Sequence, residues 1–278
     1  MSAGKKICWL NAIRTAVALI LLIPSVVCAA SPAQQRTVYA TIPWLSSMAR
    51  FIVGTTVNVQ SLTSWTSTGT LRTIRKIPQN PTVIALDPRD SVRYNFKPGR
   101  QGLYLLYENL PISDEDRTSI FFDPSILPFL SQRMLIILCE LEPENYSFYQ
   151  RRLAEFQSRL ESTLEVGRSL VGNIPMLDLT GSVSPWIRAA SEYAVRPPGD
   201  LWSAWADGRR TQELALALKE AERRGWWIVI DAWTPPQVRS QVMGVYKNVC
   251  IEPPEADHDF FTFLHDIYLR IWSASTGN

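Results

Sequence analysis

The sequence has little histidine: only His258 and His265 occur among 278 residues. Both fall on a predicted C-terminal helix, where a rise of about 1.5 Å per residue separates them by roughly 10 Å. Two imidazoles so far apart cannot chelate one ion directly, and a zinc site needs three or four close nitrogen, oxygen or sulfur ligands. An ordinary polar helix face is therefore favoured over a surface metal site.

Sequence motifs of common exported hydrolases are also missing. There is no Gly-x-Ser-x-Gly elbow, no glycine-rich phosphate loop and no His-Glu-x-x-His. Neither histidine follows a predicted strand, where the base of a catalytic triad would be needed. Asp231 and Glu252 remain as a conceivable carboxylate pair, but acids that end parallel strands suit solute binding equally well. We therefore expect that the chain is not an enzyme and carries no cofactor.

The N-terminus has the three-part pattern of a secretory signal peptide. Lys5, Lys6 and Arg14 form a basic region, residues 15–27 are mostly apolar, and small residues follow at 28–30. The apolar run is short for a bilayer span, which normally needs about 20 residues, so a signal peptide is favoured over an uncleaved membrane anchor. The sequence thus predicts that residues 1–30 are a signal peptide, that the mature protein is periplasmic, and that it has no stable membrane insertion after cleavage.

Charge and cysteine content restrict the partners further. The 28 basic and 26 acidic side chains become 25 and 26, a net charge of −1, once the three basic residues of the leader are removed. No basic stripe indicates nucleic acid. Only Cys139 and Cys250 of the four cysteines lie beyond the leader. Export permits a disulfide between them, but two unpaired, buried thiols are favoured.

The rest of the chain alternates between strand and helix patterns. Residues 38–42, a helix over 44–53 and residues 57–62 predict a β-α-β unit, which requires a parallel sheet. Residues 61–69 are predicted to form a polar loop, and a similar α/β alternation returns after residue 172. The pattern predicts an α/β protein of two lobes, each with a parallel sheet flanked by helices.

The strongest helical pattern follows Pro143. Apolar residues recur at steps of three and four, at Tyr149, Leu153, Phe156, Leu160 and Leu164. A helix over about 144–170 would be roughly 40 Å long, far beyond the ordinary length. We therefore predict an N-terminal lobe over 36–142, a linking helix over 143–171 and a C-terminal lobe over 172–278, the last closed by a helix from Asp257 to Trp272.

Ligands of parallel α/β sheets bind beyond the carboxyl ends of the strands. This rule predicts one cleft formed by residues 63–69, the turn after Leu179, Asp231 with Trp233, and Glu252.

An ordered set of short motifs resembles a known family. Phe121-Phe122-Asp123-Pro124 precedes an apolar helix, and Pro143-Glu144-Asn145 opens the long helix. This order, with Ile42-Pro43 near the start and Glu252-Pro253 near the end, is similar to the metal-ion solute-binding proteins of ABC transporters. The resemblance spans about residues 38–272. It implies a two-lobed scaffold and an ABC permease as partner.

The metal ligands that the resemblance implies are mostly missing. The family holds Zn²⁺ or Mn²⁺ with three imidazoles and a carboxylate from four cleft loops. Here the first loop, residues 64–72, has no histidine, the second ligand position falls on Ser119, and residues 180–183 hold no third histidine. Only the carboxylate ligand of the family has a counterpart of the same chemical type here, Glu252. We expect no working metal site, and the sequence leaves open whether a small solute or a metal ion is the ligand.

Aromatic residues occupy the predicted cleft loops instead. We predict a ligand site formed by Trp65, Ser119, Trp186 and Trp233 with Asp231 and Glu252 as polar anchors, suited to an organic or cationic solute. In the alternative, the same aromatic side chains fill the cleft, and the chain is an exported relative that acts by protein–protein contact.

Overall fold

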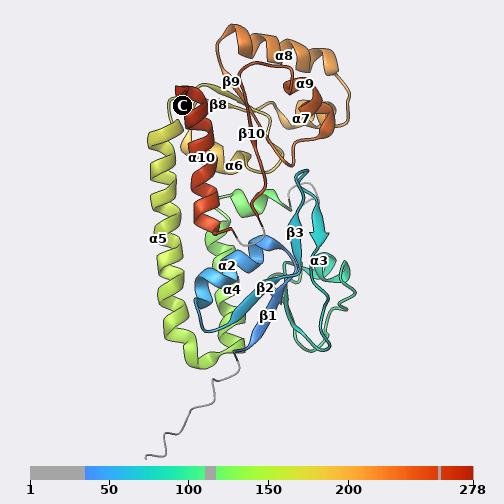
Figure 1. Ribbon diagram of the computed structural model, residues 1–278, viewed down its shortest axis with the longest axis vertical. Helices are drawn as coiled ribbons and strands as arrows, with labels where there is room; N and C mark the ends of the chain where they lie inside the picture. The colour runs from blue at the N-terminus through green and yellow to red at the C-terminus, as the bar shows by residue number, and fades with distance from the viewer. Residues whose placement is uncertain (1–34, 110–116, 256–257, 278) are drawn as a thin grey trace, which may run out of the picture. The chain divides into compact units, whose positions relative to one another are not determined.

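The computed structural model describes residues 35–109, 117–255 and 258–277 (Figure 1). Residues 36–278 form one compact unit. The predicted signal peptide and Asp257, the predicted start of the last helix, lie outside the described residues.

Two separate four-stranded sheets confirm the predicted fold class. The first has the order β2-β1-β5-β6 and the second has the order β10-β9-β7-β8, and all neighbouring strands are parallel. The first sheet consists of β1 (Thr37–Ala40), β2 (Asn58–Ser61), β5 (Thr82–Ala85) and β6 (Leu103–Leu105). The second consists of β7 (Met176–Asp178), β8 (Ala194–Val195), β9 (Trp227–Asp231) and β10 (Asn248–Ile251).

Helices cover both sheets, as parallel strands require. The helices of the N-terminal lobe are α2 (Pro43–Val53), α3 (Pro88–Val92) and α4 (Leu127–Leu141), with the 3₁₀ helices η1 (Ser119–Phe122) and η2 (Pro143–Asn145). Those of the C-terminal lobe are α6 (Ser184–Ala190), α7 (Gly199–Ala206), α8 (Thr211–Arg223) and α9 (Pro236–Val242). One face of the second sheet packs against α7, α8 and α9 through Leu177, Ile228 and Ile230.

A long helix joins the two lobes, as predicted. α5 (Tyr146–Val171) has 26 residues, and its buried stripe includes Tyr149, Leu153, Phe156 and Leu160. The last helix, α10 (Phe260–Thr276), runs beside it (Figure 1). Within the described residues, none of the helices combines the length and the apolar character needed to cross a bilayer.

The predicted polar loop after β2 is the main error in the sequence-based assignment. Residues 63–73 form an antiparallel hairpin of β3 (Thr63–Trp65) and β4 (Leu71–Thr73). The strands are only three residues long, and hydroxyl side chains fill the turn between them, so the segment lacks the apolar alternation by which a strand is recognised. The hairpin holds Trp65 at the carboxyl edge of the first sheet.

Cys139 and Cys250 are unpaired, as favoured. Cys139 and Cys250 are half-buried rather than fully buried, and burial raises the pKa of each thiol.

Candidate functional site between the lobes

Aromatic rings from both lobes meet between the two sheets. Trp65 on β3 contacts Trp233, which follows β9, with ring centroids 5.3 Å apart and planes at 90°. Phe122 of η1 lies 5.7 Å from the same Trp233 ring. The edge-to-face geometry of the Trp65–Trp233 pair is one of the two that aromatic pairs favour, and the Phe122–Trp233 pair is tilted. Two of the predicted site residues, Trp65 and Trp233, are therefore brought into direct contact.

Trp44 extends this cluster toward the last helix. Its ring lies 5.1 Å from Phe122 and 5.2 Å from Phe263 of α10. We call Trp44, Trp65, Phe122, Trp233 and Phe263 the aromatic bridge. Its rings occupy space at the carboxyl ends of the strands, where ligands of α/β proteins commonly bind.

Gly69 permits the hairpin to approach Trp233. The residue lies in the turn between β3 and β4 with φ of +72°, and a Cβ atom there would lie 2.8 Å from the Trp233 ring. A side chain would both strain the backbone and overlap the indole. The glycine thus allows Trp65 and Trp233 to meet.

A cavity of about 350 Å³ adjoins the bridge on the side of the C-terminal lobe. Thr118 is contributed by the N-terminal lobe, and the other lining residues come from the C-terminal lobe: Gly181, Ser182, Trp202, Ser203, Ala206, Asp207, Trp233 and Pro235. We call this the interlobe cavity. Its two indoles and several hydroxyl groups give it the mixed apolar and polar lining of a small-molecule site.

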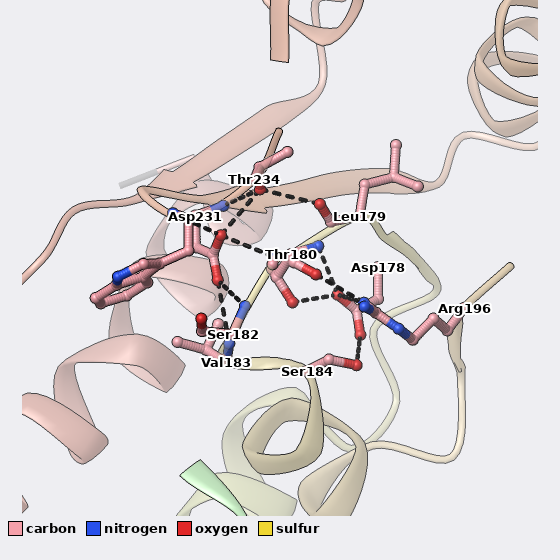
Figure 2. Close-up of polar contacts among 11 residues, drawn as sticks. Asp178, Leu179, Thr180, Ser182, Val183, Ser184, Arg196, Asp231 and Thr234 are labelled. Carbon is pink, nitrogen blue, oxygen red and sulfur yellow. Dashed lines mark hydrogen bonds and ion pairs between the residues drawn. The ribbon is translucent and has the colours of Figure 1, made fainter. Parts of the chain in front are cut away.

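Asp231 is fully buried and is not a free polar anchor (Figure 2). Its Oδ2 accepts hydrogen bonds from the backbone N–H groups of Ser182 and Val183 at 2.8 and 3.1 Å. Its Oδ1 accepts from Gly181 N–H at 2.8 Å and from the Thr234 hydroxyl at 2.9 Å. Burial raises the pKa of this carboxyl, and these hydrogen bonds oppose the rise. Asp231 therefore holds the loop over residues 181–183 rather than a solute.

A second buried acid, Asp178, completes this network (Figure 2) and was not predicted. It accepts from the Thr180 hydroxyl at 2.6 Å and from the Ser184 hydroxyl at 2.5 Å, and Arg196 Nη1 lies 3.6 Å from Oδ1. Asp178 ends β7 as Asp231 ends β9, so two acids at adjacent strand ends shape the loop that forms one wall of the interlobe cavity.

The remaining predicted residues lie in different surroundings. Glu252 is exposed, and its Oε2 lies 3.5 Å from Arg270 Nη2 on α10. Trp186 is fully buried, stacks on Tyr268 with centroids 5.5 Å apart, and donates its indole N–H to Leu264 O. Ser119 begins η1, one residue beyond Thr118 of the cavity wall. The structure thus does not bring Glu252 or Trp186 to the bridge, and we leave both out of the proposed site.

The described residues contain no cluster of three or more histidine, cysteine, aspartate or glutamate side chains that could hold a metal ion. No family model matches the sequence, and no curated protein matches it either.

Solved structures do match the fold. A crystal structure of ZnuA aligns with 86% of this chain and 98% of its own, with a TM-score of 0.63 and 16% sequence identity. A zinc-bound deletion mutant of ZnuA aligns with 86% of this chain and 98% of its own, with a TM-score of 0.61 and 16% identity. The Mn-bound periplasmic metal-binding protein from Candidatus Liberibacter asiaticus covers 87% of this chain and 99% of its own, with a TM-score of 0.58 and 11% identity. The chain therefore has the fold of periplasmic metal-binding proteins.

Proposed function

We propose that this chain is an exported, periplasmic solute-binding protein that delivers an organic solute to an ABC permease, on a scaffold whose metal ligands have been replaced. The observation that carries the proposal is the interlobe cavity, walled by Trp202 and Trp233. The fold shared with periplasmic metal-binding proteins supports the transport context.

The lining of the interlobe cavity indicates the class of solute. Indole faces favour an apolar or cationic body, and the hydroxyl groups of Thr118, Ser182 and Ser203 can exchange hydrogen bonds with it. Asp207, which is exposed and paired with Arg209 at 2.6 Å, adds a carboxylate at the rim. A volume of about 350 Å³ suits a small organic molecule that carries hydroxyl or amine groups.

Ligand screening tests this function. We expect at least one small organic solute to raise the melting temperature of the purified protein and to bind in calorimetry. Trp202→Ala should weaken its binding by about 10-fold or more, since truncating a tryptophan at a binding hot spot typically costs ~2 kcal/mol. Trp226→Ala is the matched control, because Trp226 is also half-buried and packs against the same core of the C-terminal lobe, under Arg224, but does not line the interlobe cavity.

Metal analysis gives the opposing outcome. Stoichiometric zinc or manganese in the purified protein, together with the absence of any solute effect, would overturn the proposal. Equal losses in the Trp202 and Trp226 variants would show that the cavity is not the binding site.

The aromatic bridge favours a second function, that of an exported relative acting through protein contacts. Trp44, Phe122 and Phe263 are buried and fill space between the lobes. If neither solutes nor metals bind, while the purified protein still binds its permease or another exported protein directly, this second function replaces the first.

A further inference from the structure

A second, smaller cavity lies within the N-terminal lobe. Its volume is about 80 Å³, several times the roughly 10–15 Å³ that one water molecule requires. It lies at the carboxyl ends of β1 and β5, beside the β3–β4 hairpin and η1. The polar residues of its wall are Trp44, Trp65, Asp90, Arg93, Arg117 and Thr118.

Two indole N–H groups at this cavity lack acceptors. Trp44 is 2% exposed, and the Nε1 atoms of Trp44 and Trp65 are buried with no hydrogen-bond partner among the described residues. An unpaired buried donor costs about 1–3 kcal/mol. The two tryptophans therefore favour a ligand that brings acceptor atoms into the cavity.

The charges of the wall favour a negative ligand. Arg117 is only 12% exposed at its side chain, and Asp87 fixes it with two bonds, 2.5 Å from Nη1 to Oδ2 and 2.7 Å from Nη2 to Oδ1. Arg93 is an exposed second guanidinium on the same wall. Since Asp87 accepts from both terminal nitrogens of Arg117 and offsets its charge, the positive charge that the wall offers to an anion comes mainly from Arg93.

Asp90 is the one acid among the described residues of the wall. It is 3% exposed, and its Oδ2 accepts from the Thr41 hydroxyl and from Leu86 N–H at 3.1 Å. Burial raises the pKa of this carboxyl, while the bonds from Thr41 and Leu86 and the charges of Arg117 and Arg93 oppose the rise. In its protonated form Asp90 is a further donor.

We propose that this cavity binds a small planar oxyanion, either an inorganic ion such as nitrate or the carboxylate of a very small organic acid. The indole N–H groups of Trp44 and Trp65 donate to its oxygens, Arg93 balances its charge, and Arg117, held by Asp87, borders the site. This site does not depend on the solute-binding proposal, because its wall belongs to the N-terminal lobe and the interlobe cavity is lined mainly by the C-terminal lobe.

Titration of the purified protein with sodium nitrate and sodium formate, against chloride at constant ionic strength, tests the site. We expect saturable binding in calorimetry and downfield shifts of the Trp44 and Trp65 indole resonances in ¹H–¹⁵N spectra. Binding of nitrate alone would mean that the site takes an inorganic ion, and binding of formate alone would mean that it takes a carboxylate. No saturable binding of either anion, or shifts confined to other tryptophans, would overturn the proposal.

Trp65→Phe removes one donor and keeps an aromatic ring in the bridge. We expect it to weaken anion binding by about 10- to 100-fold, the loss typical of one hydrogen bond to a charged group. Trp205→Phe is the matched control, because the Trp205 indole N–H is also buried without a described partner but lies in the core of the C-terminal lobe. Equal weakening in both variants would contradict the assignment.

The pH profile tests Asp90 separately. Anion affinity, measured from pH 5 to 8, should fall where Asp90 loses its proton, and Asp90→Asn should flatten the profile. Among the residues that the structure describes, the charged or titratable groups that face Asp90 are Arg93, Arg117 and Tyr94, and the arginines stay charged throughout this range. A profile that is unchanged in Asp90→Asn would remove Asp90 from the site.

Discussion

At the scale of single residues, Asp231 has a structural role that its position in the sequence does not indicate. It follows a buried strand, the usual place for a ligand-binding acid, yet both of its oxygens are occupied by the loop N–H groups of residues 181–183 and by Thr234. We predict that Asp231→Ala lowers the free energy of unfolding by on the order of 3–5 kcal/mol, since it leaves several buried donors unpaired. Urea denaturation measures this change.

Asp207→Ala is the control for that prediction. Asp207 is 61% exposed at its side chain and pairs with Arg209, so its loss should change stability by less than about 1 kcal/mol. Asp231 would regain its predicted role as an anchor if its replacement weakened solute binding and left stability unchanged.

The sequence predicts the kinds of residue at the site better than their orientation. Trp65 and Trp233, whose rings are in contact, were predicted because they follow predicted strands, and the strand order places strand ends together. Strand order does not determine where a side chain points beyond the strand. For this reason the sequence did not show that Glu252 turns to Arg270 and that Trp186 packs under Tyr268, away from the aromatic bridge, and their role in ligand binding stays a prediction. Trp202 was missed because α7 is a short helix with no strong periodic pattern.

At the scale of elements, the packing of α5 on α10 depends on one glycine. A Cβ atom on Gly167 would lie 2.3 Å from the Tyr268 ring, and Tyr268 is itself fixed by its hydroxyl bond to Trp186 O at 2.9 Å. Alanine favours a helix by up to about 1 kcal/mol over glycine. We nevertheless predict that Gly167→Ala lowers the free energy of unfolding by about 1–3 kcal/mol, because overpacking outweighs helix propensity.

Gly199→Ala provides the matched comparison. Gly199 opens α7, and no atom lies within 4 Å of a Cβ placed there. This substitution should be neutral or stabilise by about 0.4–1 kcal/mol. Thermal unfolding of the two variants side by side distinguishes a contact effect from a general intolerance of alanine.

The elements themselves differed in how well they could be predicted. α5 was predicted to within two residues because its apolar stripe runs unbroken beside charged residues over 26 positions. The β3–β4 hairpin was missed because three-residue strands carry too little periodic pattern to be distinguished from a loop.

At the scale of the whole molecule, the lobes share a core. One cluster of buried side chains includes Val38 and Ile84 of the first sheet, Phe156 of α5, and Val229 and Ile251 of the second sheet. Buried contacts thus continue across the domain boundaries predicted at residues 142/143 and 171/172. These boundaries stay a prediction.

Such continuity predicts that residues 36–278 unfold in a single cooperative transition. Lobes joined only by a helix would melt separately, whereas a shared core, reinforced by the Trp65–Trp233 contact, couples their unfolding. Leu45→Ala in the N-terminal lobe and Leu218→Ala in the C-terminal lobe should each cost about 2–5 kcal/mol, since both side chains are buried. Each variant should lower the same midpoint, measured identically by circular dichroism and tryptophan fluorescence. Two separated transitions, each moved by only one of the variants, would mean that the bridge fills the space between the lobes without joining their stability.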